Sequence, residues 1–309
     1  MSFDVVIVGG GPAGLAAALL LGRARKRVLL CDAGARRNAA ATHVHGFVTR
    51  DGIPPAEFRR VAREQLDAYP SVVVQDLPVE AIAARAAGRF DVTVGGRVVV
   101  ARRLVLATGM VDDLPPMPGF RELWGSAIVQ CPYCHGWEVR DRRFGYLAPG
   151  AENVEWALLL RGWTDDVIVF TDDRFAVPDE VRARLDAAGV GLEERALLGF
   201  ESTRPDASMP AALTHVALAD GTRIARDVLF AHPPQRQTAL VERLGLALDE
   251  HGYVRIDERT ATSIPGVHAA GDLTTGYQSA TLAAAAGFRA AAAVNHAITV
   301  EDALASRVA

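Results

Sequence analysis

A glycine-rich turn near the start of the chain limits what this sequence can fold into. The apolar run from Asp4 to Val8 leads into Gly9-Gly10-Gly11-Pro12-Ala13-Gly14, which has the pattern G-x-G-x-x-G. An Ala/Leu-rich helix is expected to about Arg25, and a second strand from Arg27 to Cys31 ends at Asp32. Strand, glycines, helix, strand and acid in this order predict a parallel α/β sheet that binds a dinucleotide.

The position of each residue type in this turn can be explained by what a dinucleotide-binding turn requires. Gly9 permits the tight turn, Gly11 lets the backbone approach a pyrophosphate, and Gly14 lets the helix pack against the strand. Pro12 and Ala13 start the helix, whose N-terminus favours the phosphate charge. Asp32 is placed to bind ribose hydroxyls. The pattern is of the kind that holds FAD, although a glycine-rich turn without a ligand is the plain alternative.

A second feature is Cys131-Pro132-Tyr133-Cys134-His135-Gly136. Two thiols three positions apart can close a disulfide and reopen it, which carries two electrons. The pair could also be half of a zinc site, two core thiols or a structural disulfide. The third cysteine, Cys31, lies in an apolar strand, so we expect it to be a core thiol and expect no metal site. With the dinucleotide turn, the pair predicts a flavin-dependent dithiol/disulfide oxidoreductase.

Composition restricts the class of protein further. The chain has 309 residues, enough for two domains, and 50% are hydrophobic and 23% charged, as in globular proteins. A net charge of −4 argues against nucleic-acid binding. The start shows no basic segment before an apolar one, and no long apolar run suggests a membrane span. We therefore expect a soluble cytoplasmic protein.

The rest of the first half reads as loop, helix and strands. A polar loop contains Asn38, His43 and His45, and the two histidines would share one face of an extended segment. They either contact the cofactor or lie at the surface. A helix is expected from Pro55 to about Tyr69. Short strands are expected from Val72 to Leu106, followed by Ala107-Thr108-Gly109, and then by a proline-rich linker from Asp112 to Gly119.

The second half repeats the order strand, turn, helix, strand. A strand is expected over Phe144 to Leu147, a helix over Glu152 to Arg161 and a strand over Val167 to Thr171. The segments Thr214 to Leu218 and Arg226 to Phe230 are expected to continue that sheet. The chain then contains Ser263-Ile264-Pro265-Gly266-Val267-His268-Ala269-Ala270-Gly271-Asp272, and a last helix is expected from Ser279 to Ile298.

Over nearly its whole length the chain resembles the low-molecular-weight thioredoxin reductases and their flavoprotein relatives. The resemblance rests on four segments: Gly9 to Gly14, Ala107 to Gly109, Cys131 to Gly136 and Ser263 to Asp272. It implies an α/β fold of two dinucleotide-binding, Rossmann-like, three-layer domains, the second inserted into the first. It also implies a homodimer.

The resemblance also implies where each domain begins and ends, and which residues contact the cofactor and the substrate. An FAD-binding domain would comprise residues 1–115 and 240–309, and residues 116–239 would form an inserted NAD(P)-binding-like domain that carries the thiol pair. Gly271 and Asp272 would lie at the ribityl–phosphate region of FAD, and Gln278, Ser279 and Ala280 near the flavin ring. The family usually has an arginine where Gln278 stands. Cys134 would lie against the flavin, and Cys131 would exchange with substrate.

The residue after the second cysteine departs from the family pattern. Thioredoxin reductases generally have an acidic residue soon after that cysteine, whereas this chain has His135. Cys-Pro-Tyr-Cys-His-Gly is more similar to the dithiol oxidases that close disulfides in gliotoxin- and holomycin-type natural products. His135 could accept and return a thiol proton, or it could only orient the loop.

The turn of the inserted domain also departs from the family's glycine pattern. After the strand that ends near Leu147 the chain reads Ala148-Pro149-Gly150-Ala151-Glu152-Asn153, which keeps only Gly150 of the glycine pattern. Glu152 puts a negative charge near the expected pyrophosphate. Thr171-Asp172-Asp173 stands where relatives that use NADPH carry basic residues. We therefore expect FAD as cofactor and do not expect NADP.

Three functions remain open from the sequence. The first is an FAD-dependent oxidase of a small-molecule dithiol, with oxygen as electron acceptor. Trp124, Tyr133 and Trp137 could then wall a pocket for the substrate, or serve ordinary packing. The second is a disulfide reductase of thioredoxin type, fed by NAD(P)H or ferredoxin and acting on a thioredoxin-like protein. The third is a flavin redox sensor without turnover.

Overall fold

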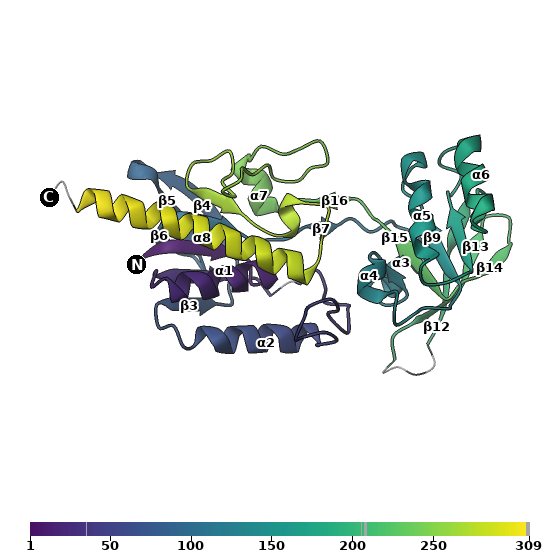
Figure 1. Ribbon diagram of the computed structural model, residues 1–309, viewed down its shortest axis with the longest axis horizontal. Helices are drawn as coiled ribbons and strands as arrows, with labels where there is room; N and C mark the ends of the chain where they lie inside the picture. Colours follow the sequence, from purple (N-terminus) through teal and green to yellow (C-terminus); the bar gives the residue numbers. More distant parts are fainter. Residues whose placement is uncertain (35, 205, 207–208, 307–309) are drawn as a thin grey trace. The chain divides into compact units, whose positions relative to one another are not determined.

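The computed structural model describes residues 1–34, 36–204, 206 and 209–306, which divide into two compact units. The first unit comprises Met1–Arg37, Gly46–Val111 and Gln235–Ala309, and the second comprises Asn38–His45 and Asp112–Pro234. The chain enters and leaves the second unit twice, first around Asn38–His45 and then at β7 (Val111–Asp112) and β16 (Gln235–Arg236). Strands β7 and β16 pair with each other (Figure 1).

The first unit is built on one mixed sheet. Its strands include β1 (Ser2–Val8), β2 (Val28–Cys31), β3 (Val72–Gln75), β4 (Val79–Arg85), β5 (Arg89–Val94), β6 (Arg97–Leu106) and β17 (Val267–Ala269). Its helices include α1 (Pro12–Arg23), α2 (Pro55–Leu66), α7 (Ala239–Leu244) and α8 (Ala280–Ala305), with short 3-10 turns η1 (Ala86–Gly88) and η3 (Asp272–Thr274).

Strands β3, β2, β1 and β6 are parallel neighbours in that order. The long strand β6 has two different partners on the edge that faces away from β1. Its first half pairs with antiparallel β5, as Phe90 opposite Ala101 shows, and its second half pairs with parallel β17, where Val267 is opposite Leu104. The sheet is therefore an α/β sheet extended by an antiparallel hairpin.

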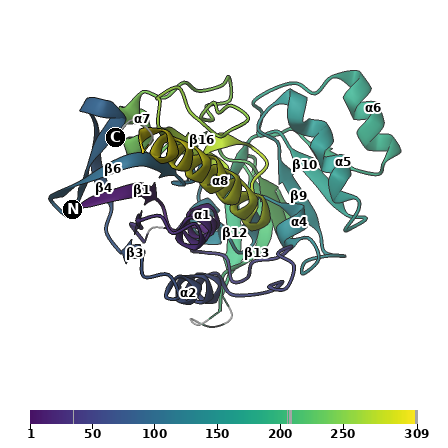
Figure 2. The ribbon, with the colours of Figure 1, turned by 60° about the vertical axis from the view of Figure 1, so that its left-hand side comes forward.

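The alternation of side chains along β1 explains why this strand is apolar throughout. Val5 and Ile7 pack into the cluster formed with α1 and α8, whereas Val6 and Val8 pack into the cluster on the opposite face of the sheet. Both faces of the strand are thus buried. Helices α1 and α8 lie side by side against the sheet (Figures 1 and 2). They approach closely at Gly287, where an added Cβ would lie 1.9 Å from the Ala13 carbonyl oxygen.

Three parallel strands end at the same edge of this sheet. The amide of Ala107 donates to the carbonyl of Val8 at 2.8 Å, and the amide of Ala270 donates to the carbonyl of Leu106 at 2.9 Å. The segments that follow β1, β6 and β17 therefore meet at the carboxyl edge, which is where ligands bind to open α/β sheets.

The second unit has a parallel sheet of its own. Its strands include β8 (Ile128–Val129), β9 (Phe144–Leu147), β10 (Val167–Phe170), β11 (Gly191–Glu193), β12 (Leu197–Thr203), β13 (Ala212–Leu218), β14 (Arg223–Ala225) and β15 (Val228–Ala231). Its helices include α3 (Phe120–Leu123), α4 (Pro132–His135), α5 (Ala157–Leu160) and α6 (Asp179–Ala187), with the 3-10 turn η2 (Ala151–Trp156).

The parallel sheet of the second unit has the order β11-β10-β9-β15-β8, and β12, β13 and β14 form a separate antiparallel sheet. The expectation that Thr214 to Leu218 continues the parallel sheet is therefore wrong. That segment pairs with its neighbours in sequence, with His215 opposite Glu201 on one side and Ala225 on the other. Short connections favour such antiparallel pairing over a crossover.

The predicted fold class is confirmed, whereas several element boundaries were wrong. Helix α2 ends at Leu66 and not near Tyr69, because Pro70 disfavours helical geometry in the residue before it. Helix α8 continues to Ala305, and its last turns are held by pairs of Arg102 with Asp302 at 2.7 Å and with Glu301 at 3.2 Å.

The expected helix from Glu152 to Arg161 is only partly helical. Residues Ala151–Trp156 form the tighter 3-10 turn η2, and only Ala157–Leu160 form an α-helix. Trp156 is fixed against the rings of Tyr146 and His232, with centroid distances of 4.8 and 4.6 Å. The turn after β9 therefore lacks a long helix start.

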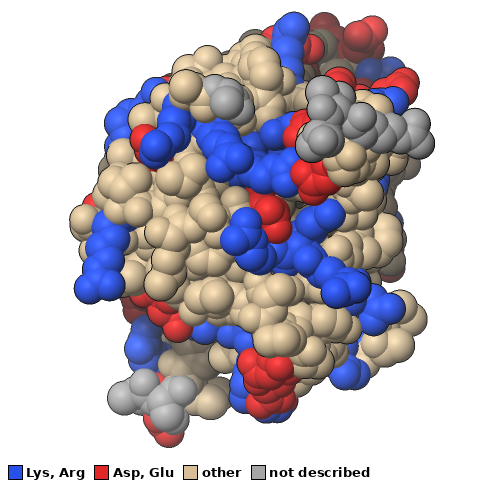
Figure 3. Space-filling model, turned by 90° about the vertical axis from the view of Figure 1, so that its left-hand side faces the viewer, with Lys and Arg blue, Asp and Glu red and all other residues tan. Residues whose placement is uncertain are grey.

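Figure 3 shows the end of the first unit that carries the two termini. Lys and Arg side chains lie beside Asp and Glu over this face. Arg102 contacts Asp302, and Arg103 contacts Glu301, at the junction of β6 and α8. Lys26 donates to Thr299 at 3.0 Å. Part of the positive charge on this face is thus paired with acidic side chains.

Candidate active site

The turn after β1 has the geometry that its glycines predict. Gly9 has φ of +113°, and a Cβ there would lie 2.2 Å from the Ala107 carbonyl oxygen. At Gly14 a Cβ would lie 1.8 Å from the Gly9 carbonyl oxygen. Both positions therefore require glycine. An added Cβ at Gly11 would meet no atom within 4 Å, so this side of the turn is open.

The open side of the turn fits a dinucleotide. Helix α1 begins immediately after Gly11 with Pro12 at its first position, and no side chain caps its N-terminus. Amide groups at a helix start and the helix dipole favour a phosphate. Ala13 is buried and lies beside Gly271, where an added Cβ would be 3.1 Å from the Ala13 Cβ. These residues thus form a cradle with the open space and the free helix amides that a pyrophosphate needs, and contact with FAD stays a prediction.

The two loops beside this turn complete the cradle. Ala107 is buried beneath Gly9, while Gly109 has φ of +65° and nothing within 4 Å of an added Cβ. Thr108 is half-buried, and its hydroxyl lies 3.5 Å from the Gly109 carbonyl oxygen. Gly109 therefore leaves space at the same edge of the sheet where Gly11 does.

Asp32 is held by two arginines that the sequence reading did not single out. Its carboxylate pairs with Arg59 and lies 3.3 Å from Arg63, both on α2, and accepts the Gly34 amide at 3.0 Å. The carboxylate is 9% exposed, so the pair is nearly shielded from water. Their spacing of four residues puts the two arginines on one helix face, but it does not identify Asp32 as their partner. Binding of ribose hydroxyls by Asp32 stays a prediction.

The segment before α8 contains another arginine contact. Arg37 donates to Asp272 Oδ2 at 3.0 Å and to Gln278 Oε1 at 2.5 Å. Ser279 caps α8, because its hydroxyl accepts the Leu282 amide at 3.1 Å, and Ala280 is the first residue of that helix. The structure thus brings Asp272 and Gln278 together, with Arg37 between them.

The thiol pair lies in the second unit, at a short helix. Cys131 is the N-cap of α4, and Cys134 lies on that turn. Both cysteines are free thiols with their sulfurs 2.7 Å apart, within reach of a disulfide bond. Gly136 ends the turn against Trp163, where an added Cβ would lie 2.8 Å from the indole nitrogen. The sequence motif is therefore a compact dithiol turn.

The two thiol environments of the chain differ sharply. A hydrogen bond from the Cys134 thiol, with backbone amides of Cys134 and Tyr133, lowers the pKa of Cys131 to about 7 although burial opposes this. Burial raises the pKa of Cys31 to about 12. Only a thiolate attacks a disulfide. Cys131 can thus react near neutral pH, while Cys31 is an inert core thiol.

His135 is a half-buried imidazole beside the pair. Burial lowers its pKa below the usual value for histidine, with His45 adding to that effect and Glu138 opposing it. Its Nδ1 is buried and contacts no hydrogen-bond partner within the described part of the chain. The ring is therefore neutral at pH 7 and able to accept a proton.

The segment with Asn38, His43 and His45 belongs to the second unit, as the thiol pair does. The rings of His43 and His45 lie 5.9 Å apart, as their alternation predicts, and His45 Nε2 lies 3.5 Å from Glu138 Oε1. Asn38 is exposed. The structure therefore connects His45 to Glu138, three residues after the end of α4, and contact of Asn38 and His45 with the cofactor stays a prediction.

The turn after β9 differs from the one after β1. Ala148 is buried, and its carbonyl accepts Arg174 at 2.9 Å. The carboxylate of Glu152 folds back over Gly150, where an added Cβ would lie 2.6 Å from it. The side of the turn that is open at Gly11 is thus covered here by a carboxylate.

The acidic segment after β10 is part of the same region. Asp172 accepts the Leu197 amide at 2.7 Å, and Arg174 Nε lies 3.7 Å from the Asp172 carboxylate. Thr171 is fully buried and Asp172 and Asp173 both have positive φ. Arg174 is the basic residue that the sequence reading missed, and here it pairs with Asp172 and with the Ala148 carbonyl.

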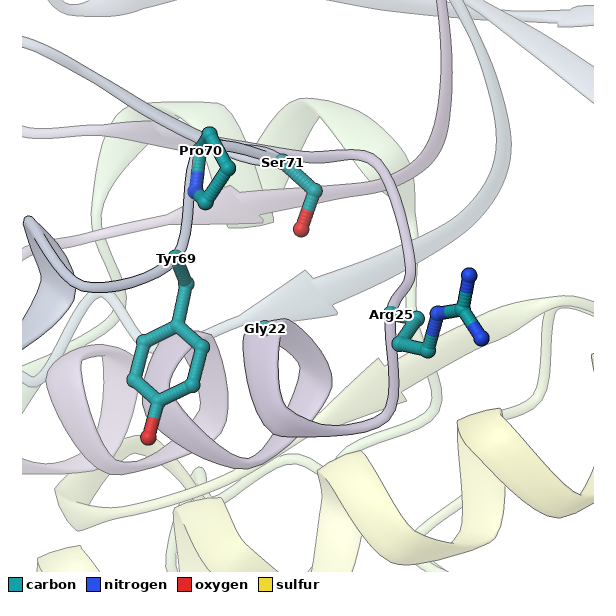
Figure 4. A pocket seen from close by; sticks show the side chains of 5 residues that line it. All are labelled: Gly22, Arg25, Tyr69, Pro70 and Ser71. Atoms are coloured by element: carbon teal, nitrogen blue, oxygen red, sulfur yellow. The ribbon is translucent and has the colours of Figure 1, made fainter.

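A cavity at the C-terminal end of α1 contains none of the predicted site residues. It has a volume of about 380 Å³ and is lined by Gly22, Arg25, Tyr69, Pro70 and Ser71 (Figure 4). Among the described residues, no group of three or more His, Cys, Asp or Glu is arranged to hold a metal ion. No described helix is long and apolar enough to cross a membrane.

The open glycine turn on a parallel sheet and the dithiol turn define a class, the flavin disulfide oxidoreductases. The chain belongs to the pyridine nucleotide-disulphide oxidoreductase family, whose model matches residues 3–287. Its thioredoxin reductase-like members are flavoproteins, usually with FAD.

Individual relatives agree with this assignment. Thioredoxin reductase tcpT of Claviceps purpurea is 32% identical, over 87% of this chain and 86% of the relative. The crystal structure of an oxidoreductase from Agrobacterium tumefaciens has a TM-score of 0.89 and 38% identity, covering 97% of this chain and 99% of that one. The crystal structure of HlmI has a TM-score of 0.90 and 36% identity, covering 99% and 95%.

Proposed function

We propose that this protein is an FAD-dependent oxidase of a small-molecule dithiol, which closes the substrate's disulfide and passes the electrons to oxygen. The observation that carries the proposal is the dithiol turn, with sulfurs 2.7 Å apart and the pKa of Cys131 lowered to about 7. The motif's resemblance to gliotoxin- and holomycin-type dithiol oxidases gives the direction of the reaction.

The reaction balances as a thiol–disulfide exchange. One substrate thiolate attacks Cys131 of the Cys131–Cys134 disulfide, and Cys134 leaves as the first enzyme thiolate. The second substrate thiolate then attacks the substrate sulfur of the mixed disulfide and releases Cys131. The two protons that the substrate thiols give up are taken by the two cysteines, so the substrate leaves as a disulfide and the enzyme pair is a dithiol. Bound FAD would accept the two electrons of the resulting dithiol and give them to oxygen, which yields hydrogen peroxide.

The lowered pKa of Cys131 favours this direction. A thiol of low pKa leaves a disulfide faster than an ordinary one. Release of Cys131 from the mixed disulfide is therefore assisted. His135, neutral at pH 7 because burial lowers its pKa, can take the proton of the substrate thiol.

Exposed aromatic side chains near the thiols support an apolar substrate. Tyr133 is 71% exposed and Trp137 is 66% exposed, although both are large hydrophobic residues. The Tyr133 ring lies edge-on to Trp163 with centroids 5.6 Å apart, and Arg140 lies 4.0 Å over the Trp137 ring. Trp124, by contrast, stacks on Phe120 at 5.8 Å, which is a packing role.

A thioredoxin-type disulfide reductase is the second candidate, favoured by similarity to relatives such as thioredoxin reductase tcpT. It would act on a thioredoxin-like protein and take electrons from NAD(P)H or ferredoxin. The carboxylate of Glu152 over Gly150 opposes a nicotinamide dinucleotide at the second turn. A homodimer in the cytoplasm is proposed for either activity, and a redox sensor without turnover is the remaining alternative.

Anaerobic stopped-flow absorbance separates these functions. The oxidised protein is mixed separately with a small dithiol, NADPH and NADH, and flavin bleaching is recorded. Bleaching by the dithiol alone, followed by return of colour and hydrogen peroxide when air is admitted, is expected. Rapid bleaching by a nicotinamide at micromolar concentration would instead identify the reductase. Thiols that titrate without any turnover would identify the sensor.

A further inference from the structure

Arg37 occupies a defined place in the first unit. It follows β2 in the sequence, yet its guanidinium contacts Asp272 at the start of η3 and Gln278 just before α8, at 3.0 and 2.5 Å. The side chains of Arg37 and Asp272 are 22% and 24% exposed, so the pair is partly shielded from water. Segments that lie more than two hundred residues apart in the sequence thus share one polar cluster.

Gln278 is oriented to accept the guanidinium. Its side-chain amide nitrogen donates to Gln235 Oε1 at 2.9 Å and to the Thr275 carbonyl at 3.1 Å. With its NH₂ group engaged in this way, its Oε1 faces Arg37. These hydrogen bonds therefore fix Gln278 as an acceptor for Arg37.

The charge balance of the cluster points to its role. Asp272 places a carboxylate in a site that is proposed to receive a diphosphate, and like charges at short range oppose binding. Gln278 has no charge, although the resembling family usually has an arginine at that position. Arg37 brings one positive charge to the same place from a different part of the chain.

We propose that Arg37 is a cofactor-binding residue that supplies the positive charge of the flavin site in place of an arginine at position 278. The inference rests on the proposed FAD binding by the first unit. A guanidinium stays protonated at all physiological pH values, so its charge offsets Asp272 throughout. It favours an anionic phosphate group and the negative charge that a flavin gains on reduction.

The test uses the full-length protein and two readouts. The affinity of the apoprotein for FAD is measured by fluorescence titration, and the midpoint potential of the bound flavin by equilibration with a reference dye. Arg37→Gln should weaken FAD binding roughly tenfold or more, the usual effect of losing a charge-assisted hydrogen bond. It should also lower the potential. Arg37→Lys should keep the potential and lose part of the affinity.

A charge-relocation variant makes the test specific. Gln278→Arg in the Arg37→Gln background should bring back the potential and most of the affinity, because it returns the charge to the same cluster. Arg50→Gln is the matched control, since Arg50 is exposed in the same unit and donates to the Thr49 carbonyl at 2.9 Å. It should change neither readout.

The outcomes distinguish this inference from the function on which it rests. If wild-type apoprotein does not bind FAD, the proposed function fails. If wild type binds FAD and Arg37→Gln matches it in affinity and potential, only the role of Arg37 is wrong. The role is also overturned if the double variant behaves as Arg37→Gln does, because a positive charge at position 278 then does not replace the charge of Arg37.

Discussion

The two strand–turn–helix segments of this protein share an architecture and differ in what their turns can accept. In the first, Gly9 and Gly14 allow a tight turn and Gly11 leaves it open before the start of α1. In the second, the Ala148 carbonyl is bound by Arg174, Glu152 covers Gly150, and a 3-10 turn replaces the helix start. The same frame thus has an open turn in one unit and a covered turn in the other.

The comparison shows that binding resides in a few turn residues and not in the fold. In both sheets the strand before the turn lies between two parallel neighbours, β1 between β2 and β6 and β9 between β10 and β15. Only the first presents uncapped helix amides beside open space. The unit with the closed turn instead carries the thiol pair, so the open turn and the dithiol turn belong to different units. From this we expect that cofactor binding and thiol chemistry are affected by different substitutions.

The largest effect is expected from Gly11→Asp. A carboxylate at this open position would face the cofactor's phosphates at the start of α1, so flavin content should fall to almost nothing. The matched control is Gly150→Asp in the second turn, which should leave flavin content unchanged. The measurement is flavin absorbance per protein after purification. Full occupancy in Gly11→Asp would assign the pyrophosphate to another loop.

His135→Ala should slow the thiol half-reaction roughly 10²-fold, the usual range for loss of an acid–base group. Because burial lowers the pKa of His135, its neutral form persists below pH 6.5, so the wild-type rate should hold as the pH falls to that value. Stopped-flow with a dithiol across pH 5–8 measures this.

Two comparisons delimit the role of His135. Flavin content should not change in His135→Ala, because the residue belongs to the unit without the open turn. His43→Ala, which removes an exposed histidine of the same unit, should leave the rate unchanged. A loss smaller than about threefold in His135→Ala would leave His135 only an orienting role.

Much of this division could be predicted from the sequence, because it depends on neighbours in the chain. The roles of Gly9, Gly11 and Gly14 follow from spacing, and the lack of a glycine at Ala148 is visible at once. The arginine contacts could not be predicted in this way. Arg37 reaches Asp272 and Arg59 reaches Asp32 through tertiary packing of segments that no local pattern connects.

The same limit applies to the boundaries that were wrong. The 3-10 turn η2 depends on Trp156 packing against Tyr146 and His232, which are brought together only by the folded sheet. Pairing of β13 with β12 and β14 likewise depends on which of two sheets the strand joins, which its own residues do not specify. Propensity alone does not decide such choices.

A smaller effect concerns the reactivity of Cys131. With a pKa of about 7, half of Cys131 is thiolate at pH 7. A thiolate of low pKa is a weaker nucleophile than an ordinary thiolate, so the gain in rate is smaller than the gain in thiolate. Alkylation of Cys131 by iodoacetamide at pH 7 should therefore be roughly fivefold faster than that of an ordinary thiol. The rate should rise with pH through about 7 and then level off. Peptide mass spectrometry of the reduced protein measures it site by site.

Two variants sharpen this prediction. Cys134→Ala removes the main hydrogen bond that lowers the pKa, so the alkylation midpoint of Cys131 should move to higher pH. Flavin-free Gly11→Asp should keep the wild-type midpoint, since the hydrogen bonds are all made within the second unit. Cys31 should stay unmodified over the same range, because burial raises its pKa to about 12. A midpoint near 9 in wild type would contradict the assignment of Cys131 as the reactive thiol.

The smallest effect is expected from reopening the second turn with Ala148→Gly and Glu152→Ala together. The double variant removes the carboxylate over Gly150 and permits a tighter turn, which should improve nicotinamide dinucleotide affinity only about fivefold, as for other partly exposed charges. The 3-10 start of η2 and the Arg174 contact to the backbone remain, so no strong site results. NADH should gain more than NADPH, because Asp172 stays near the expected position of the 2′-phosphate. Calorimetric titration measures both ligands, with Glu180→Ala on α6 as an exposed carboxylate control. If wild type binds NADPH with micromolar affinity, the second turn is not closed and the contrast between the two turns is wrong. If the double variant binds neither dinucleotide more tightly than wild type does, the 3-10 start, and not the charge of Glu152, closes the second turn.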